Sequence, residues 1–287
     1  MKNNMIDHGR AFDWGCTSSD YARYRDIYPE AFYQKLLTKN IGTKGQKILD
    51  IGTGTGVIPR NMYRYGAAFT GVDIAENQIE QARNLAAAQN MEITFLCAPA
   101  ENAQFPGQTF DVVTACQCFP YFRHEELAKH LHTILKSDGR FAIMYMAWLP
   151  LEDRIAAKSE ELILQYNPDW TGCNEVRRRI GIPDAYDAYF TLEEEELFDI
   201  AVPFTRDSWN GRIKACRGIG ASLSEAEIEA FEKEHRRLLQ EIAPEEFEIL
   251  IWNRRNHKVY DDETLILRFV EYIRCNYTIG RHGTPYS

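Results

Sequence analysis

The sequence predicts an α/β protein with a doubly wound, mostly parallel sheet and helices on both of its faces. Between residues 45 and 147, short apolar runs alternate with segments rich in helix-forming residues. That alternation is typical of βα units joined by right-handed crossovers. The runs are apolar throughout rather than at every second position, which is the pattern of strands buried on both faces. A glycine-rich turn follows the first of these runs, at residues 52–56.

Local signals place the individual elements. The expected strands lie at residues 47–51, 68–72, 93–97, 110–115 and 140–147, and the expected helices between them lie at residues 57–65, 75–90 and 124–136. Pro59 falls in the first turn of the first helix, where a missing N–H costs little. In the second helix Ile79, Ala82 and Ala86 form an apolar stripe at helical spacing. The third helix is expected to stop near Gly139.

The pattern changes after residue 150. Two helical stretches, at residues 151–166 and 191–198, flank a loop rich in proline and glycine, and this part is expected to be a mainly helical insertion. In the second stretch the acidic run Glu193–Glu196 follows Thr191, a candidate N-cap. Carboxylates in a first helical turn suit the helix dipole, so a structural role is expected for this run.

The remaining elements are expected to complete the sheet. Residues 198–205 would return to it at an edge, because Pro203 cannot donate a ladder hydrogen bond. Residues 245–252 would supply the last strand. Between them Ser224 opens a helix with a capping box. Residues 262–275 are apolar enough for a further helix.

Composition narrows the classes of partner. The chain has 287 residues, a formal net charge of −9 and a pI near 5.4, and such an acidic surface repels phosphate backbones, so nucleic acid is not expected as a partner. No apolar run approaches the roughly 20 residues of a membrane-spanning helix, and the first residues hold no signal-peptide core. These absences predict a cytoplasmic protein. The seven cysteines and seven histidines lack zinc-like spacing, so thiols and no metal site are expected.

The strongest functional signal is the turn in ILDIGTGTG together with GVDIA, where the next strand ends. Gly52, Gly54 and Gly56 lie between a predicted strand and a predicted helix, where glycine permits a positive φ and lets a ligand approach the backbone. The helix N-terminus beyond offers N–H groups to an anion. Asp73 ends the next strand, where a carboxylate can accept hydrogen bonds from both hydroxyls of a ribose. The expected ligand is therefore a nucleoside that carries an anionic group.

Two classes of cofactor fit this geometry. The dinucleotide fingerprint G-x-G-x-x-G fails here, because its third glycine would fall at Val57 or at Pro59. The observed G-x-G-x-G, preceded by Asp50, instead resembles motif I of the class I S-adenosylmethionine-dependent methyltransferases. The N-terminal stretch FDWGCTSSDYARYRDIYP is similar to small-molecule members of that family, in the group of the ubiquinone-biosynthesis and trans-aconitate methyltransferases.

The resemblance implies S-adenosylmethionine as cofactor, S-adenosylhomocysteine as product and a seven-stranded Rossmann-like sheet of order 3-2-1-4-5-7-6. The segment APAENAQF after the third strand would then hold the adenine. The segment TACQCFPYF after the fourth strand resembles motif IV, beside the transferable methyl group. The residues expected to bind the cofactor are Asp50, Gly52, Thr53, Gly54, Gly56, Asp73, Ile74, Ala100, Glu101, Gln117, Tyr21 and Arg25.

Methyl transfer from a sulfonium is an in-line displacement, so the protein mainly positions the nucleophile and excludes water. A base is needed only if the nucleophile carries a proton at neutral pH. No catalytic residue is assigned, and the candidates are His124, Tyr121 and Gln117. Trp209 and Arg212 either reach the substrate pocket or serve as a packing residue and a solvated charge.

The predicted organisation has five parts. They are an N-terminal helical lid segment (1–40), a cofactor-binding core (41–150), a helical insertion that acts as a substrate lid (151–197), a completion of the sheet (198–253) and a tail without an assigned role (254–287). The predicted function is methyl transfer to an unidentified small molecule. The alternatives are an NAD(P)-dependent oxidoreductase on a similar fold and a non-catalytic methyltransferase-like protein that binds the cofactor. A homodimer, with the tail as its arm, is left open.

Overall fold

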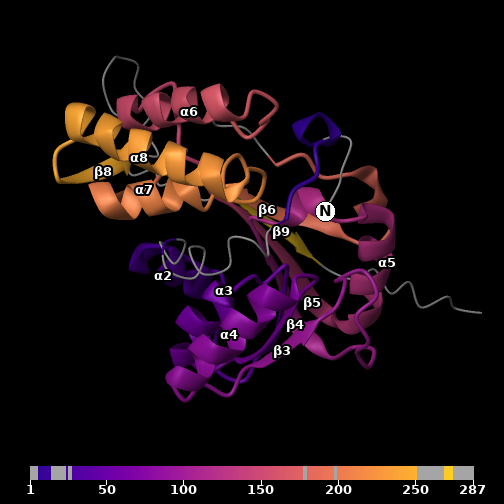
Figure 1. Ribbon diagram of the computed structural model, residues 1–287. Helices are drawn as coiled ribbons and strands as arrows, with labels where there is room; N and C mark the ends of the chain where they lie inside the picture. The colour runs from indigo at the N-terminus through magenta and orange to yellow at the C-terminus, as the bar shows by residue number, and fades with distance from the viewer. Residues whose placement is uncertain are drawn as a thin grey trace, which may run out of the picture.

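Five parallel strands form the centre of the computed structural model, in the order β3-β2-β1-β4-β5. Figure 1 labels β3, β4 and β5 of this sheet. The strands are β1 Lys47–Ile51, β2 Ala68–Asp73, β3 Thr94–Cys97, β4 Phe110–Cys116 and β5 Leu135–Tyr145. The predicted parallel sheet and the order of its first five strands are confirmed. The structure describes residues 6–13, 24, 28–176, 180–196, 199–250 and 268–273, and of residues 250 and 268–273 it describes the backbone alone.

Both faces of this sheet are buried, as its apolar strands predict. Successive side chains along a strand point to opposite faces. In β5, Met144 therefore belongs to the core on one face and Ile143 to the core on the other. The first core is covered by α2 Glu30–Thr38 and α3 Val57–Met62, and the second is covered by α5 His124–Ile134.

The helix α4 Glu76–Ala88 connects β2 to β3 and carries the predicted apolar stripe. Its residues Ile79, Ala82 and Ala86 are buried and pack with Phe95 of β3. Short 3-10 helices also occur, at η1 Asp7–Gly9, η3 Tyr63–Tyr65, η4 Phe119–Tyr121 and η5 Asp184–Tyr186.

The segment β6 Thr191–Glu196 is a strand, where the sequence predicted a helix over residues 191–198. It pairs antiparallel with β9 Arg268–Ile273, and β9 pairs antiparallel with β5, so both strands extend the central sheet. The predicted helix over residues 262–275 is therefore also wrong in its described part.

Ion pairs with a distant helix explain why the acidic run is a strand. Glu194 and Glu196 lie two residues apart and so share one face of a strand. On that face Lys39 of α2 pairs with both carboxylates, and Lys35 pairs with Glu196. In a helix the same two carboxylates would point about 200° apart, so one of them would leave the lysines. Thr191 accordingly begins a strand and caps no helix.

The strands β7 Ala201–Thr205 and β8 Glu246–Leu250 do not complete the central sheet, contrary to the prediction for residues 198–253. They pair with each other, antiparallel, in a separate two-stranded sheet. Each strand of a two-stranded ribbon is an edge strand, which is the position that tolerates Pro203.

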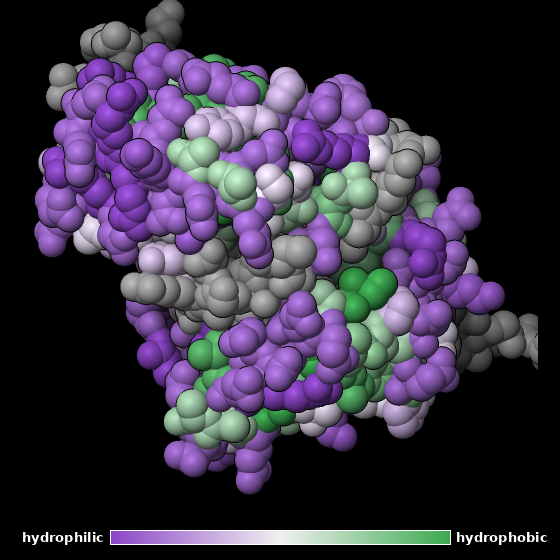
Figure 2. Space-filling view, viewed as in Figure 1, coloured by the Kyte–Doolittle hydropathy of each residue, from purple (hydrophilic) through white to green (hydrophobic). Residues whose placement is uncertain are grey.

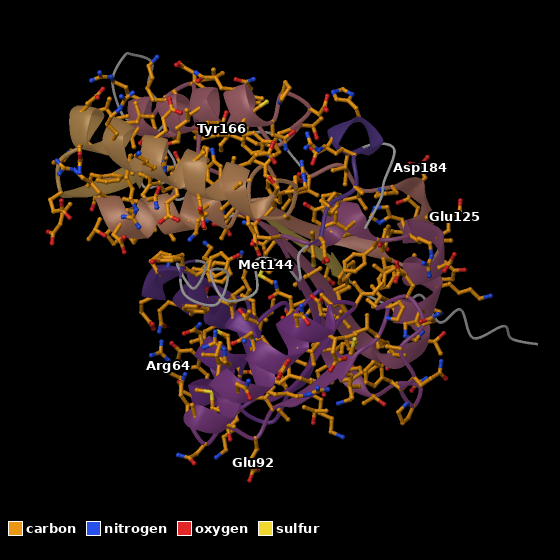
Figure 3. All side chains as sticks on the ribbon, viewed as in Figure 1. Arg64, Glu92, Glu125, Met144, Tyr166 and Asp184 are labelled. Atoms are coloured by element: carbon orange, nitrogen blue, oxygen red, sulfur yellow. The ribbon has the colours of Figure 1, made fainter. Side chains whose placement is uncertain are left out.

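A layer of three helices lies above the sheet in Figure 1: α6 Arg154–Tyr166, α7 Arg206–Lys214 and α8 Glu225–Ile242. The predicted helix start at Ser224 is confirmed, and its capping box with Glu227 is formed. Figure 3 shows Met144 of β5 at the centre, between the sheet and this layer. Its side chain is fully buried in a core that also contains Trp209 of α7, so the two layers share one core.

The visible face of the molecule is mostly hydrophilic, and its hydrophobic residues gather in separate patches (Figure 2). This agrees with a chain in which 26% of the residues are charged. Among the helices that the structure describes, none combines the length and the apolar character needed to cross a membrane.

A polar network is buried between the three upper helices. The ring nitrogens of His235 lie 2.9 Å from Asn210 Oδ1 and 3.0 Å from Ser159 Oγ. Ser159 Oγ also accepts the indole N–H of Trp209, at 2.9 Å. Burial disfavours the charged imidazolium and lowers the pKa of His235 to about 3. The network therefore holds a neutral histidine at neutral pH.

Protonation of His235 is expected to destabilise the fold. The unfolded chain binds this proton with a pKa near 6.5 and the folded chain with a pKa of about 3. The stabilisation is therefore complete above about pH 6.5 and is lost as the pH falls, by roughly 1 kcal/mol per pH unit. Urea unfolding between pH 7 and pH 4 measures this slope, which His235→Gln should reduce and the matched control His8→Gln, at an exposed residue, should keep. An unchanged slope in His235→Gln would contradict the assignment.

Candidate active site

A cavity of about 770 Å³ lies at the C-terminal ends of the parallel strands, below the helical layer. Its volume falls in the range of pockets that hold small-molecule ligands. In doubly wound sheets, ligands bind at this end of the strands. Predicted site residues that line it are Gly52, Gly54, Asp73, Ile74, Ala100, Glu101, Gln117, Tyr121 and Arg212.

The glycine turn forms one wall of the cavity. Gly52 has a φ of +61°, which side chains rarely adopt. A Cβ atom at Gly52 would lie 2.6 Å from the Cβ atom and 2.8 Å from the Sγ atom of Cys118. The close packing of Gly52 against Cys118 therefore excludes a side chain at this position. Without a side chain, the backbone of the turn is open to a ligand on the cavity side.

Asp73 holds this turn against the start of α4. One carboxylate oxygen accepts the N–H of Gly54 and the other accepts the N–H of Ala75, each at 2.9 Å. Burial raises the pKa of Asp73, although these backbone hydrogen bonds act in the opposite direction. Each carboxylate oxygen retains acceptor capacity at the cavity wall, where it fits the two hydroxyls of a ribose.

Three further residues predicted to bind the cofactor, Asp50, Thr53 and Gly56, lie behind this wall. Asp50 is buried and accepts the hydroxyls of Thr53 at 2.7 Å and Thr114 at 2.6 Å. Desolvation raises the pKa of Asp50 to about 7. Gly56 precedes α3 with a φ of +73°. These residues support the turn rather than line the cavity.

Residues after β3 and β4 line the next part of the cavity. Ala100 and Glu101 follow β3, and a Glu101 carboxylate oxygen accepts the N–H of Arg123 at 3.0 Å. Gln117 follows β4 with a φ of +66°, and its side-chain amide donates to the carbonyl of Met146 at 2.5 Å. The described strand ends thus bring together the two segments that the sequence placed around the cofactor.

His124 is not brought into the cavity. Its Nδ1 atom lies 3.1 Å from the hydroxyl of Tyr186, and its ring packs against Phe119. Burial lowers the pKa of His124. Among the described lining residues there is no histidine and no lysine. The expected contacts of Tyr21 and Arg25 lie outside the described residues.

Residues from the helical layer line the far part of the cavity. Arg212 of α7 is 5% exposed, and its guanidinium lies 4.8 Å from the ring centroid of Trp148. The indole N–H of Trp148 donates to a carboxylate oxygen of Glu160 at 2.6 Å. Trp209 does not line the cavity and instead packs edge-on against Trp148, with ring centroids 5.5 Å apart. Of the two candidate substrate contacts in α7, the structure brings only Arg212 to the site.

Lining residues that the sequence did not predict include Tyr145, Trp148, Glu175 and Arg217. Trp148 could have been found, because it directly follows the strand predicted at residues 140–147, at the end of the sheet where ligands bind. Arg217 lies five residues after Arg212 and had no comparable signal. Its guanidinium pairs with Asp7 at 2.7 Å and donates to the hydroxyl of Tyr121 at 2.8 Å.

The cavity thus offers a carboxylate held by two backbone N–H groups, an open glycine turn and a mixed aromatic and cationic far wall. Within the described part of the chain, no three His, Cys, Asp or Glu side chains gather in a way that would hold a metal ion. The residues present fit a nucleoside at the glycine turn, because the turn has no side chain there and Asp73 faces the cavity.

Comparisons with known proteins agree with this geometry. Residues 48–139 match a family model described as a methyltransferase domain. A ubiquinone biosynthesis O-methyltransferase of Coxiella burnetii is 30% identical over 110 residues, which are 37% of this chain and 46% of that protein. The corresponding protein of Neisseria meningitidis is 31% identical over 133 residues, 44% of this chain and 54% of that protein. The chain therefore spans about half the length of the curated relatives that it matches.

Two solved structures share the fold at low sequence identity. One comes from work on the conversion of a disulfide bond into a thioacetal group during echinomycin biosynthesis. It is 16% identical to this chain, with a TM-score of 0.52, and the match covers 86% of this chain and 82% of the other. The other, MccD protein, is 16% identical with a TM-score of 0.51 and covers 85% of this chain and 97% of its own.

The glycine turn, Asp73 and the β3 and β4 ends all fall inside or at the border of the matched region. They are the features on which the resemblance in sequence depends. The chain therefore contains a class I methyltransferase domain, and S-adenosylmethionine is the cofactor of that domain.

Proposed function

We propose that this protein transfers the methyl group of S-adenosylmethionine to a small molecule. The observation that carries the proposal is one continuous cavity, with Asp73 and the glycine turn at one end and Trp148 and Arg212 at the other. Such a cavity has room for an acceptor beside the cofactor. The net charge of −9 supports a small molecule rather than a nucleic acid as acceptor.

Different residues of the cavity would bind different parts of the cofactor. Asp73 would accept the ribose hydroxyls, the backbone at Gly52 and Gly54 would border the amino-acid part, and Ala100 and Glu101 would flank the adenine. When bound, the cofactor supplies an electrophilic methyl group on a sulfonium. The chain then has to place an acceptor nucleophile in line with that methyl group and keep water out.

The chain is proposed to act by positioning rather than through a strong base. Gln117 and Tyr121 line the cavity and are fixed there, Gln117 by the carbonyl of Met146 and Tyr121 by Arg217. They are suited to orient an acceptor. His124 is not given a role, because it contacts Tyr186 outside the lining.

The segments before β1 and between β5 and β6 are proposed to close the cavity as a lid. The described N-terminal residues support this, because Asp7 accepts the hydroxyl and the N–H of Thr171 at 2.9 and 2.8 Å and pairs with Arg217. Phe12 packs on Tyr121 with ring centroids 5.8 Å apart, and Asp13 reaches the cavity lining. These contacts between the two proposed lid segments support the proposal.

The compartment and the assembly are also proposals. The described cysteines are thiols, which supports a reducing, cytoplasmic location. A homodimer that uses the tail stays a proposal, because most of residues 254–287 lie outside the described residues.

Substitution of Asp73 should abolish cofactor binding. Asp73→Ala removes the acceptors for the ribose hydroxyls, and affinity for S-adenosylhomocysteine should fall about 100-fold or more. Calorimetric titration with S-adenosylmethionine, S-adenosylhomocysteine and NADH measures this. Asp73→Asn, which keeps the side-chain shape, separates ligand loss from misfolding, and the exposed Asp138→Ala is the matched control. Binding of NADH alone by the wild-type chain would defeat the proposal.

Binding of S-adenosylmethionine should release protons near pH 7. Because Asp50 has a pKa of about 7, it is partly protonated there, and the net positive charge of the cofactor would lower that pKa. Titrations at pH 7 in two buffers of different ionisation enthalpy should give different binding enthalpies. The difference should shrink in Asp50→Asn, whereas the part due to the α-amino group of the cofactor, whose pKa is about 8, should remain. Buffer-independent enthalpies at pH 7 would be incompatible with this titration.

Weakening the contact of Asp7 should open the lid. Asp7 is 1% exposed, and Asp7→Asn removes the charge that Arg217 faces. We expect faster amide hydrogen exchange at residues 6–13 in the S-adenosylhomocysteine-bound protein, measured by mass spectrometry, because a broken buried ion pair costs about 3–5 kcal/mol. Asp169→Asn is the control, since Asp169 faces Arg10 at 3.9 Å in an exposed pair. Equal exchange in Asp7→Asn and Asp169→Asn would argue against the lid.

A further inference from the structure

We propose that the acceptor is a flat, apolar molecule with an anionic group, and that Arg212 binds this anion in the far part of the cavity. The inference rests on the proposed methyltransferase function and adds the chemical class of the acceptor. Three features support it: the contacts that fix Arg212, the distribution of charged residues in the cavity, and the aromatic residues around Arg212.

Arg212 is fixed before any ligand arrives. It is 5% exposed, and its guanidinium lies over the ring of Trp148. That ring is itself held by the hydrogen bond from its N–H to Glu160 and by the edge contact with Trp209. A desolvated guanidinium in a fixed place forms charge-assisted hydrogen bonds to a carboxylate at little cost in side-chain entropy.

Arg217, the second arginine in this part of the cavity, contacts the N-terminal segment. Arg217 pairs with Asp7 and donates to Tyr121, so its charge is used to join the N-terminal segment to the cavity wall. Arg212 lies over the ring of Trp148 in the lining of the far part, and this position is the reason to assign the incoming anion to Arg212.

The charges of the cavity also set the direction in which an anionic acceptor binds. The cofactor end carries Asp73, Glu101 and Arg123, whereas the rest of the lining carries Arg212, Arg217, Glu175 and Asp13, so the cofactor end is the more negative of the two. An anionic group is therefore repelled less near Arg212 than at the cofactor end. The uncharged part of the acceptor would then point toward the cofactor, where the methyl group is transferred.

The walls near Arg212 suit a flat apolar body. Trp148, Trp170 and Met146 line this part, and Trp170 is 5% exposed. A Cβ atom at Gly172 would lie 2.6 Å from the indole nitrogen of Trp170, so the loop backbone packs closely against this ring and fixes it. Indole rings favour stacking with planar ligands. An aromatic carboxylate combines the two properties that this part of the cavity selects.

A matched pair of probes tests the inference. The protein is loaded with S-adenosylhomocysteine, and its tryptophan fluorescence is followed during titration with 4-hydroxybenzoate or with the neutral 4-hydroxybenzamide at equal ionic strength. The expected result is saturable binding of the acid at least tenfold tighter than that of the amide. Arg212→Gln should remove this preference, and Arg123→Gln should keep it. Arg123 is the matched control because it lines the same cavity near Glu101.

Each other outcome overturns the proposal. Equal binding of the two probes, tighter binding of the amide, no binding of either probe, or a preference that survives in Arg212→Gln would each exclude an anion site at Arg212. Calorimetric binding of S-adenosylhomocysteine to the wild-type and Arg212→Gln proteins is measured in parallel. If the wild-type protein does not bind S-adenosylhomocysteine, the proposed methyltransferase function itself is contradicted. If it binds S-adenosylhomocysteine but shows no preference for the acid, only the proposal of an anionic acceptor is contradicted.

Discussion

The carboxylate of Asp73 is the contact on which the site depends. Its two oxygens hold the N–H groups of Gly54 and Ala75, so it connects the turn after β1 to the start of α4. The same oxygens are the ribose acceptors of the proposed complex. In that proposed complex the cofactor would meet a carboxylate that the backbone has already oriented, and binding would need little rearrangement.

A second layer of polar contacts fixes the acceptor end in a similar manner. Asn210 contacts His235, and His235 contacts Ser159. Ser159 accepts the indole N–H of Trp209, and Trp209 packs against Trp148, over which Arg212 lies. These groups are buried, and a buried polar group is costly unless it is hydrogen-bonded. The network thus ties the position of the far wall to the packing of α6, α7 and α8.

The sequence predicted the parts of this protein that depend on neighbouring residues. The five parallel strands, the glycine turn and Asp73 are local signals, and the structure places the turn and Asp73 at one cavity. The sequence failed where distant residues decide the structure. The acidic strand β6 depends on Lys35 and Lys39, which are 155 residues or more away in the chain. The acceptor end likewise combines the end of β5, the loop at residues 170–175 and α7, and no single motif encodes that combination.

The acidic strand β6 also affects whether two copies of the protein can associate through the edge of the sheet. Among the strands that the structure describes, β6 is the last on its side of the sheet, and an edge strand exposes backbone groups that can pair with another chain. Its sequence is TLEEEE, and its first four residues are exposed. A second copy that docked there edge to edge would bring two rows of carboxylates together. The run of glutamates therefore opposes edge-to-edge aggregation of the protein, in addition to its ion pairs with α2.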